Sequence, residues 1–163
     1  MIVLIGFMGA GKTTVGQKLA KRLRLPFIDS DELVEAKTGK SIPELFDTVG
    51  ESGFREIEAE AVVGALGGAQ GVLALGGGSL ASDEVRTALA SHTVIWIEIG
   101  YAEALRRISG DANRPLLQGA DLYARFTARQ KVYEAAADLR LTVDHQTSSR
   151  VVDTINELLC FKP

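Results

Sequence analysis

The sequence predicts an α/β fold in which parallel strands alternate with helices in a single domain. A continuous apolar run, Met1–Ile5, ends at Gly6 and is typical of a strand buried on both faces of a sheet. Val72–Leu75 and Thr93–Ile99 predict two more buried strands, each followed by a helical pattern. The chain has 163 residues, 46% of them hydrophobic, which is enough for one sizeable core. Strands that alternate with helices favour a parallel sheet.

The remaining elements follow from periodicity and from helix and turn signals. Apolar residues at helical spacing predict a helix over residues 13–25, which Pro26 ends before a short strand at Phe27–Ile28. Ser109–Leu122 is polar, contains two glycines and a proline, and predicts a mobile loop. The other expected helices span residues 31–37, 41–49, 54–66, 102–108, a segment ending near 137, and 150–159, and the last strand spans 139–143.

Charge and composition exclude several classes of protein. With 18 Lys and Arg against 21 Asp and Glu, the net charge of −3 lacks the basic footprint of a nucleic-acid binder. Apolar runs are too short for a membrane span or a secretory signal. The lone Cys160 cannot form an intrachain disulfide, and we expect it to be buried on the last helix. We expect a cytoplasmic monomer that binds neither nucleic acid nor membrane.

A phosphate-binding loop follows the first strand. Gly6–Thr13 matches the pattern G-x-x-x-x-G-K-[ST] between a buried strand and the start of a helix. Its backbone N–H groups can surround a β-phosphate, Lys12 can reach the β and γ oxygens, and the Thr13 hydroxyl can bind Mg²⁺. The residues expected to bind the nucleotide here are Gly9, Ala10, Gly11, Lys12, Thr13 and Thr14.

Two acidic residues follow the second strand. Asp29 and Asp31 stand at the carboxyl end of that strand, the edge of an open α/β sheet where ligands bind. One could serve a metal ion and the other a substrate. Alternatively, Asp31 or Ser30 simply caps the helix that follows.

Further polar candidates have plain structural alternatives. Arg55 could bind an anionic substrate while Glu58 holds it, although such a pair is usually a solvated helix face. The backbone of Gly76–Gly78 could approach a substrate, or could form an ordinary tight turn. Arg114 in the irregular stretch could deliver a guanidinium to a transferring phosphate, or could be a surface residue.

Taken together, these motifs closely resemble shikimate kinase over residues 2–159. The resemblance rests on the order and spacing of the phosphate loop, Asp-Ser-Asp at 29–31, Gly-Glu-x-x-Phe-Arg at 50–55, Gly-Gly-Gly at 76–78, Arg-Pro-Leu-Leu at 114–117 and Arg129-x-x-x-Tyr133. It implies a P-loop, nucleoside-monophosphate-kinase-like fold with three α/β/α layers, a central, mainly parallel five-stranded sheet and a mobile lid. The single domain would span 1–163, with the lid at about 109–122 and the acceptor-binding segment at about 29–60.

The resemblance also implies roles for individual residues in phosphorylating shikimate at its 3-position with ATP. Lys12, Asp31 and Arg114 would be catalytic, Asp31 also binding the ring hydroxyls and Arg114 meeting the phosphate. One Mg²⁺ ion would be bound by Thr13 and Asp29. The acceptor would be held by Arg55, Arg129, Gly77 and Gly78, and the adenine would contact Arg107.

The sequence departs from the family pattern at two places, and two other functions stay open. The chain is several residues shorter than usual between Arg114 and Arg129, and residues 144–150 lack the proline that often packs on adenine. The same fold could phosphorylate another polyol acid such as gluconate. A non-catalytic nucleotide-binding module is a further alternative, although it would not need Lys12, Thr13, Asp31, Arg55 and Arg114 together.

Overall fold

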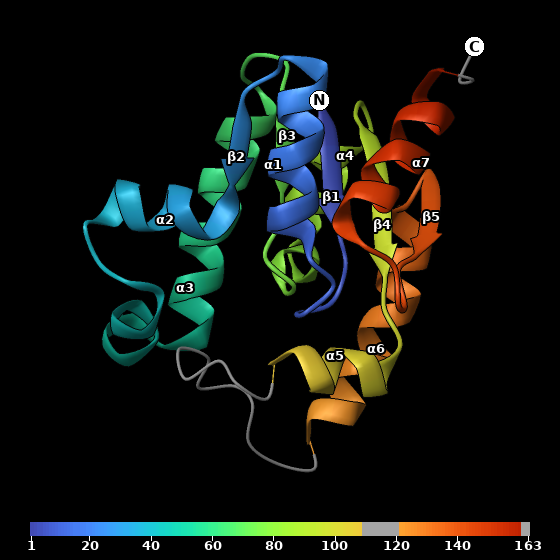
Figure 1. Ribbon diagram of the computed structural model, residues 1–163. Coiled ribbons are helices and arrows are strands. Elements are labelled where there is room, and N and C mark those ends of the chain that lie inside the picture. The colour runs from blue at the N-terminus through green and yellow to red at the C-terminus, as the bar shows by residue number, and fades with distance from the viewer. Residues whose placement is uncertain (109–120, 161–163) are drawn as a thin grey trace.

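The fold is built on one parallel sheet. A computed structural model describes residues 1–108 and 121–160 (Figure 1). Its five strands are β1 (Ile2–Ile5), β2 (Phe27–Asp29), β3 (Val72–Ala74), β4 (Thr93–Glu98) and β5 (Leu139–Thr142). They lie in the order β2-β3-β1-β4-β5, and every pairing is parallel. The predicted α/β class and five-stranded sheet are confirmed.

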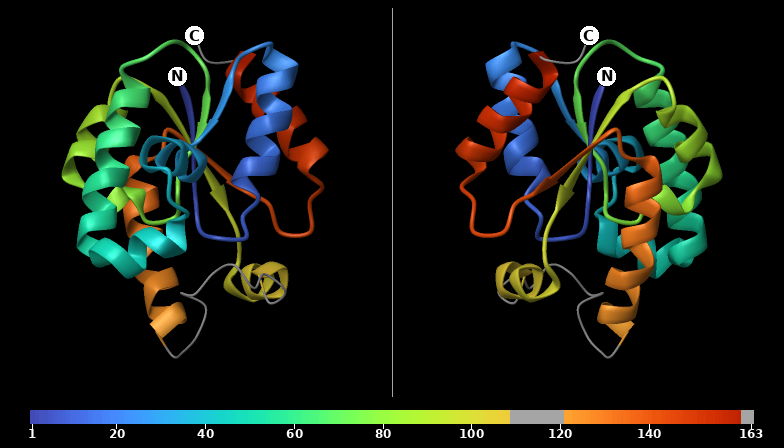
Figure 2. Two further views of the ribbon diagram at one scale, coloured as in Figure 1. Left: turned by 90° about the vertical axis from the view of Figure 1, so that its left-hand side faces the viewer. Right: turned by 90° about the vertical axis from the view of Figure 1, so that its right-hand side faces the viewer.

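Helices cover both faces of this sheet. The α-helices in the described part of the chain are α1 (Lys12–Leu23), α2 (Ser30–Thr38), α3 (Ile42–Leu66), α4 (Asp83–Leu89), α5 (Tyr101–Ile108), α6 (Asp121–Ala136) and α7 (Ser148–Cys160). A short 3₁₀ turn, η1, spans Ser79–Ala81. Figure 2 shows α1 and α7 on one face and α3, α4 and α6 on the other. Because all five strands are parallel, their carboxyl ends meet at one edge of the sheet, where α/β proteins bind ligands.

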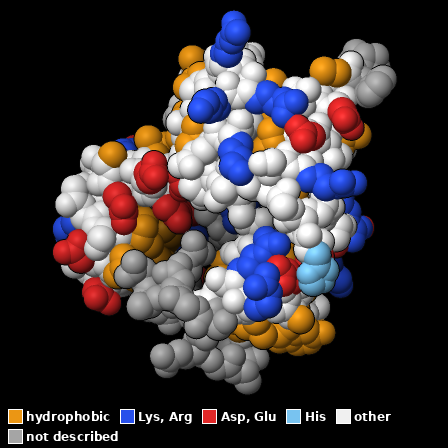
Figure 3. Space-filling model, in the orientation of Figure 1, with side chains coloured by type: hydrophobic (Ala, Val, Ile, Leu, Met, Phe, Trp, Pro, Cys, Tyr) orange, Lys and Arg blue, Asp and Glu red, His pale blue; other side chains and the backbone are white. Residues whose placement is uncertain are grey.

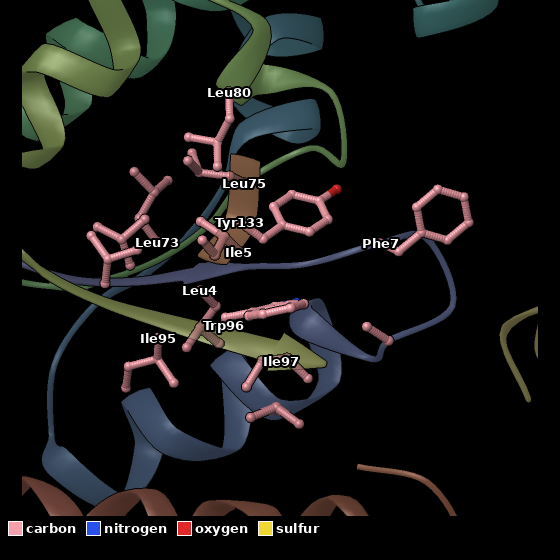
Figure 4. Packing of buried hydrophobic residues seen from close by; sticks show 14 of the residues in the cluster. Leu4, Ile5, Phe7, Leu73, Leu75, Leu80, Ile95, Trp96, Ile97 and Tyr133 are labelled. Carbon is pink, nitrogen blue, oxygen red and sulfur yellow. The ribbon is translucent and has the colours of Figure 1, made fainter. Parts of the chain in front are cut away.

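The main core lies on the central strands. Leu4, Ile5, Leu73, Ile95 and Ile97 are each at most 1% exposed, as expected for parallel strands covered on both faces (Figure 4). A smaller cluster of Val34, Leu45, Phe54 and Ala61 joins α2 to α3. Among the described helices, none combines the length and apolar character needed to cross a bilayer.

The structure bears on two predicted helices near the expected acceptor segment. Within α3 two helical segments meet at Gly50, whose φ of 70° and ψ of −179° are not helical, so the predicted break after Val49 is confirmed. Only glycine adopts this conformation readily, which explains why the direction of the chain changes here. The cap of α2 is Asp29, whose Oδ1 accepts from Asp31 N at 3.0 Å, rather than Asp31 or Ser30.

Two expectations toward the C-terminus are also wrong. The irregular stretch was expected to reach residue 122, but α6 already begins at Asp121, and Leu122 is buried against the main core. Cys160 is on the last helix as expected, but it is exposed. It occupies the final position of α7, beyond the residues that this helix buries, Val151, Val152 and Ile155.

Candidate active site

The phosphate loop joins β1 to α1 at the open edge of the sheet. Gly9 and Gly11 adopt φ of 79° and 88°, a left-handed conformation that side chains oppose. Gly11 is the N-cap of α1, so the first N–H groups of the helix face an end without a capping side chain. Lys12 Nζ donates to the carbonyls of Gly6 at 2.9 Å and Phe7 at 3.2 Å. The loop therefore offers aligned N–H donors, the positive end of α1 and an ammonium group to an anion.

The proposed metal-binding pair is formed between two segments. Thr13 Oγ1, at the start of α1, donates to Asp29 Oδ2 at 2.8 Å. A hydroxyl and a carboxylate are the oxygen ligands that Mg²⁺ accepts alongside phosphates and water. This donor set fits a magnesium ion held mainly by a nucleotide. Within the described residues no cluster of three or more His, Cys, Asp or Glu could hold a metal by itself.

A cavity of about 550 Å³ lies beside the loop, between the main body and the α2–α3 side. In the orientation of Figure 1 the surface is hollowed here, and acidic side chains gather on the α2–α3 side (Figure 3). The cavity is lined by Met8, Asp31, Glu35, Ser41, Ile42, Pro43, Phe46, Phe54, Arg55, Glu58, Gly76, Gly77, Gly78 and Arg129. The residues that the family resemblance assigns to the acceptor, namely Asp31, Arg55, Gly77, Gly78 and Arg129, thus line one cavity.

Arg55 is held by a buried carboxylate. Glu58 is 1% exposed, and its Oε2 accepts from Arg55 Nη1 at 2.5 Å while its Oε1 accepts from Ser79 Oγ at 2.6 Å. A second carboxylate oxygen, Glu51 Oε1, lies 3.7 Å from Arg55 Nη2. The alternative of a solvated helix face is therefore wrong for this pair. A buried carboxylate with two donors fixes the arginine where it lines the cavity.

The glycine-rich turn after β3 is packed against the same arginines. A Cβ on Gly78 would lie 2.6 Å from Arg55 Cζ, and one on Gly77 would lie 3.2 Å from Arg129 Nη1. One on Gly76 would lie 2.6 Å from Glu58 Oε1 and 2.9 Å from Asp31 Oδ1. Glycine is needed here for close approach, because a side chain would displace charged groups of the cavity.

A smaller cavity of about 260 Å³ lies on the other side of the loop, toward α7. Its lining consists of Gly9, Ala10, Gly11, Thr14, Val15, Arg107, Val143, Gln146, Ser148 and Val151. Arg107 donates from Nε to Glu103 Oε1 at 2.8 Å and from Nη1 and Nη2 to the carbonyls of Gly9 and Val143, both at 3.3 Å. The predicted adenine contact therefore lies beside the phosphate loop, at the β5–α7 connection.

Sequence reasoning foresaw Glu58 as the partner of Arg55 but missed Glu103, Ser79 and Gln146. Glu103 accepts from both Arg106 and Arg107, which lowers its pKa from 4.5 to about 2. Its spacing of three and four residues from two arginines was the available signal. Ser79, which donates to Glu58, and Gln146, which lines the smaller cavity, carry no motif and are recognised only in the folded structure. Arg114 lies outside the described residues.

Comparison with known proteins agrees with this geometry. A family model described as shikimate kinase matches residues 8–160. The chain belongs to the shikimate kinase family. A shikimate kinase of Rhodococcus erythropolis is 44% identical over 154 residues, covering 92% of this chain and 91% of that protein. One from Mycobacterium avium is 45% identical over 154 residues, covering 92% of this chain and 88% of the other.

A solved structure supports the same assignment. Shikimate kinase from Acinetobacter baumannii in complex with shikimate superposes with a TM-score of 0.93 at 34% identity, covering 98% of this chain and 92% of that one. The chain is thus a shikimate kinase by family, an enzyme of the shikimate pathway that phosphorylates shikimate with ATP. The family generally uses Mg-ATP. The gluconate and non-catalytic alternatives are not supported by this family membership.

Proposed function

We propose that the two cavities divide the reaction between them, the smaller one binding ATP and the larger one binding shikimate. The observation that carries this proposal is that adjacent residues of the phosphate loop line different cavities, Met8 the larger and Gly9 the smaller. A phosphoryl group bound at the loop would then face both substrates. Phosphoryl transfer needs positioning and charge neutralisation more than covalent chemistry from the protein.

On the acceptor side, Arg55 and Arg129 bind the shikimate carboxylate. Their guanidinium groups line the same cavity, and Glu58 holds Arg55 in place. Charge-assisted, bidentate hydrogen bonds are the interaction that arginine forms best with a carboxylate. Gly77 and Gly78 lie against the ring, where the absence of side chains leaves room for it.

In the chemical step, Asp31 accepts the proton of the shikimate 3-hydroxyl. The hydroxyl oxygen forms a bond to the γ-phosphorus as the bond from that phosphorus to the β–γ bridging oxygen breaks, giving shikimate 3-phosphate and ADP. Lys12 and the loop N–H groups hold the transferring group and its leaving oxygen. Arg114, by family resemblance, adds a guanidinium to the same phosphoryl group.

One Mg²⁺ ion completes the nucleotide side. Thr13 Oγ1 would hold it directly and Asp29 would support it, as their 2.8 Å hydrogen bond favours. When bound, the ion neutralises charge on the β- and γ-phosphates. Thr14 and the backbone of Gly9–Gly11 bind the phosphates, and Arg107 packs on the adenine.

The protein acts as a cytoplasmic monomer in this proposal. Among the described residues the large exposed apolar side chains are spread over α3, α5, α6 and α7: Val49, Val63, Leu105, Tyr123 and Leu158. Scattered residues of this kind are ordinary on a monomer surface. Light scattering of the purified protein measures its molar mass in solution. A mass of 17.4 kDa would support the monomer, and twice that mass would refute it.

A coupled assay of ADP release tests the proposed reaction. With Mg-ATP present, adding shikimate should raise ADP release by orders of magnitude above the rate without acceptor. Gluconate at the same concentration is the matched acid control and should leave the rate at background. Equal rates with the two acids, or no response to shikimate, would refute the proposal.

A further inference from the structure

Tyr133 is a buried residue whose hydroxyl contacts the wall of the larger cavity, where shikimate is proposed to bind. It lies on α6 and is 1% exposed, and the centroid of its ring lies 6.0 Å from the ring centroid of Trp96. Figure 4 shows the ring among Ile5, Leu75 and Trp96 with its hydroxyl at the outer end. That hydroxyl donates to the carbonyl of Gly77 at 2.6 Å. The partner is thus a residue that lines the larger cavity.

The hydroxyl is not needed to fill the core. A phenylalanine would provide the same ring packing without a polar group that has to find a buried partner. Burial raises the pKa of Tyr133 to about 12, so the phenol stays protonated and acts as a donor at neutral pH. Gly77 therefore has a permanent hydrogen-bond donor on the side facing α6.

The glycine turn depends on such partners because it has no side chains of its own. The N–H of Gly76 donates to Ser30 Oγ at 2.7 Å, and the carbonyl of Gly76 accepts from Ser79 N at 3.2 Å. Tyr133 holds the next carbonyl, that of Gly77. In a trans peptide the N–H of Gly78 points opposite to that carbonyl, so the bond also fixes the direction of this donor. Glycine torsions are otherwise the freest in the chain.

Tyr133 also connects this turn to the helix that carries Arg129. The two residues are four apart on α6 and share one face of it. A Cβ on Gly77 would lie 3.2 Å from Arg129 Nη1, so one helix presents a cation and a donor to the same glycine. The opposite side of the turn meets Arg55 at Gly78. The turn therefore sits between the two arginines of the cavity.

We propose that Tyr133 is a positioning residue, whose hydroxyl fixes the Gly76–Gly78 turn against α6 and thereby sets the spacing of Arg129 and Arg55 around the acceptor. This role rests on the acceptor-binding function proposed for those two arginines. It predicts an effect on acceptor binding that is separate from protein stability and from nucleotide binding.

Tyr133→Phe tests the proposal, with Tyr101→Phe as the matched control. Tyr101 packs on Phe126, with ring centroids 5.3 Å apart, and does not line either cavity. We expect Tyr133→Phe to raise the KM for shikimate about five- to tenfold, with the KM for ATP within about twofold and Tm within about 3 °C of wild type. The control should change none of them. An unchanged shikimate KM, with or without a lower Tm, or an equal rise in both KM values, would overturn the proposal.

Hydrogen exchange without any substrate gives a second measurement that does not depend on the acceptor. Amide exchange in residues 75–80 should become faster in Tyr133→Phe and stay unchanged in Tyr101→Phe. The reason is that the bond of Gly76 N to Ser30 Oγ and the bond of Ser79 N to the Gly76 carbonyl both depend on the position of the turn. Unchanged exchange in Tyr133→Phe would overturn the positioning role. If wild-type protein fails to phosphorylate shikimate, the proposed function fails, while this exchange result still decides whether Tyr133 holds the turn.

Discussion

The two cavities beside the phosphate loop are built by different means. The phosphate-binding part of the nucleotide side uses backbone N–H groups, left-handed glycines and a helix N-terminus, all within one continuous segment, and α5 and the β5–α7 connection complete the smaller cavity. The acceptor side uses charged side chains from α2, α3 and α6 together with the glycine turn after β3, and its arginines are held by buried partners such as Glu58. A loop of this kind is specified locally, whereas the acceptor site is specified by the packing of distant segments. Substitutions should therefore affect the two sides separately.

The largest expected effect is on the nucleotide side. Lys12→Ala should reduce kcat/KM at least about a thousandfold, because it removes the ammonium at the phosphates. The Lys12 ammonium donates to the loop carbonyls of Gly6 and Phe7, so we expect the Lys12→Ala variant to keep its fold, as judged by circular dichroism and Tm. Lys37→Ala, which removes an exposed partner of Glu60, is the control and should keep full activity. Near wild-type turnover of Lys12→Ala would refute the assignment.

The next largest effect concerns Arg114. Arg114→Ala should reduce kcat about a hundredfold while ATP affinity stays within about twofold, because its contact is made mainly to charge that develops in the transition state. Arg125→Ala tests whether a second arginine near this segment shares the work and should leave kcat within a factor of a few. A loss of ATP affinity without a loss of kcat would place Arg114 in ground-state binding instead.

A smaller effect is expected on the acceptor side. Arg55→Ala and Arg129→Ala should each raise the shikimate KM about tenfold or more, since a charge-assisted bond contributes about 1.5 to 3 kcal/mol. The KM for ATP should stay within about twofold. Arg22→Ala, which removes an exposed pair with Asp153, controls for the loss of an arginine. Weaker ATP binding with unchanged shikimate binding would place either arginine on the nucleotide side.

The smallest effect comes from Glu103. Glu103→Gln should raise the KM for ATP a few fold, because Arg107 loses the carboxylate that orients it. Since the pKa of Glu103 is lowered from 4.5 to about 2, its ionised form stabilises the fold above about pH 4.5, and this contribution is lost as pH falls toward 2.

The Tm difference between wild type and Glu103→Gln should accordingly shrink over that pH range. Glu98→Gln is a matched control, because Glu98 also binds an arginine, Arg140, and has a lowered pKa. It should change Tm but not the KM for ATP. An ATP KM unchanged in Glu103→Gln would show that Arg107 does not depend on this carboxylate.

The same contrast explains how much the sequence could predict. The strands and the phosphate loop carry local signals, namely apolar runs, glycines and a lysine at fixed spacing, and these were predicted with small errors in boundaries. The burial of Glu58 could not be foreseen, because it depends on Ser79, 21 residues away, and on the turn after β3. Local capping rules allowed Ser30 or Asp31 as the cap of α2, and only the geometry at the end of β2 selects Asp29.

Calorimetry on two variants tests most directly whether the two sides bind their ligands separately. A non-hydrolysable ATP analogue and shikimate are titrated into wild type, Lys12→Ala and Arg55→Ala. We predict that Lys12→Ala weakens binding of the analogue at least about tenfold and leaves shikimate binding within about twofold, and that Arg55→Ala does the reverse. If either variant weakened both ligands equally, or if the two effects were exchanged, the division of the site into a nucleotide side and an acceptor side would be contradicted.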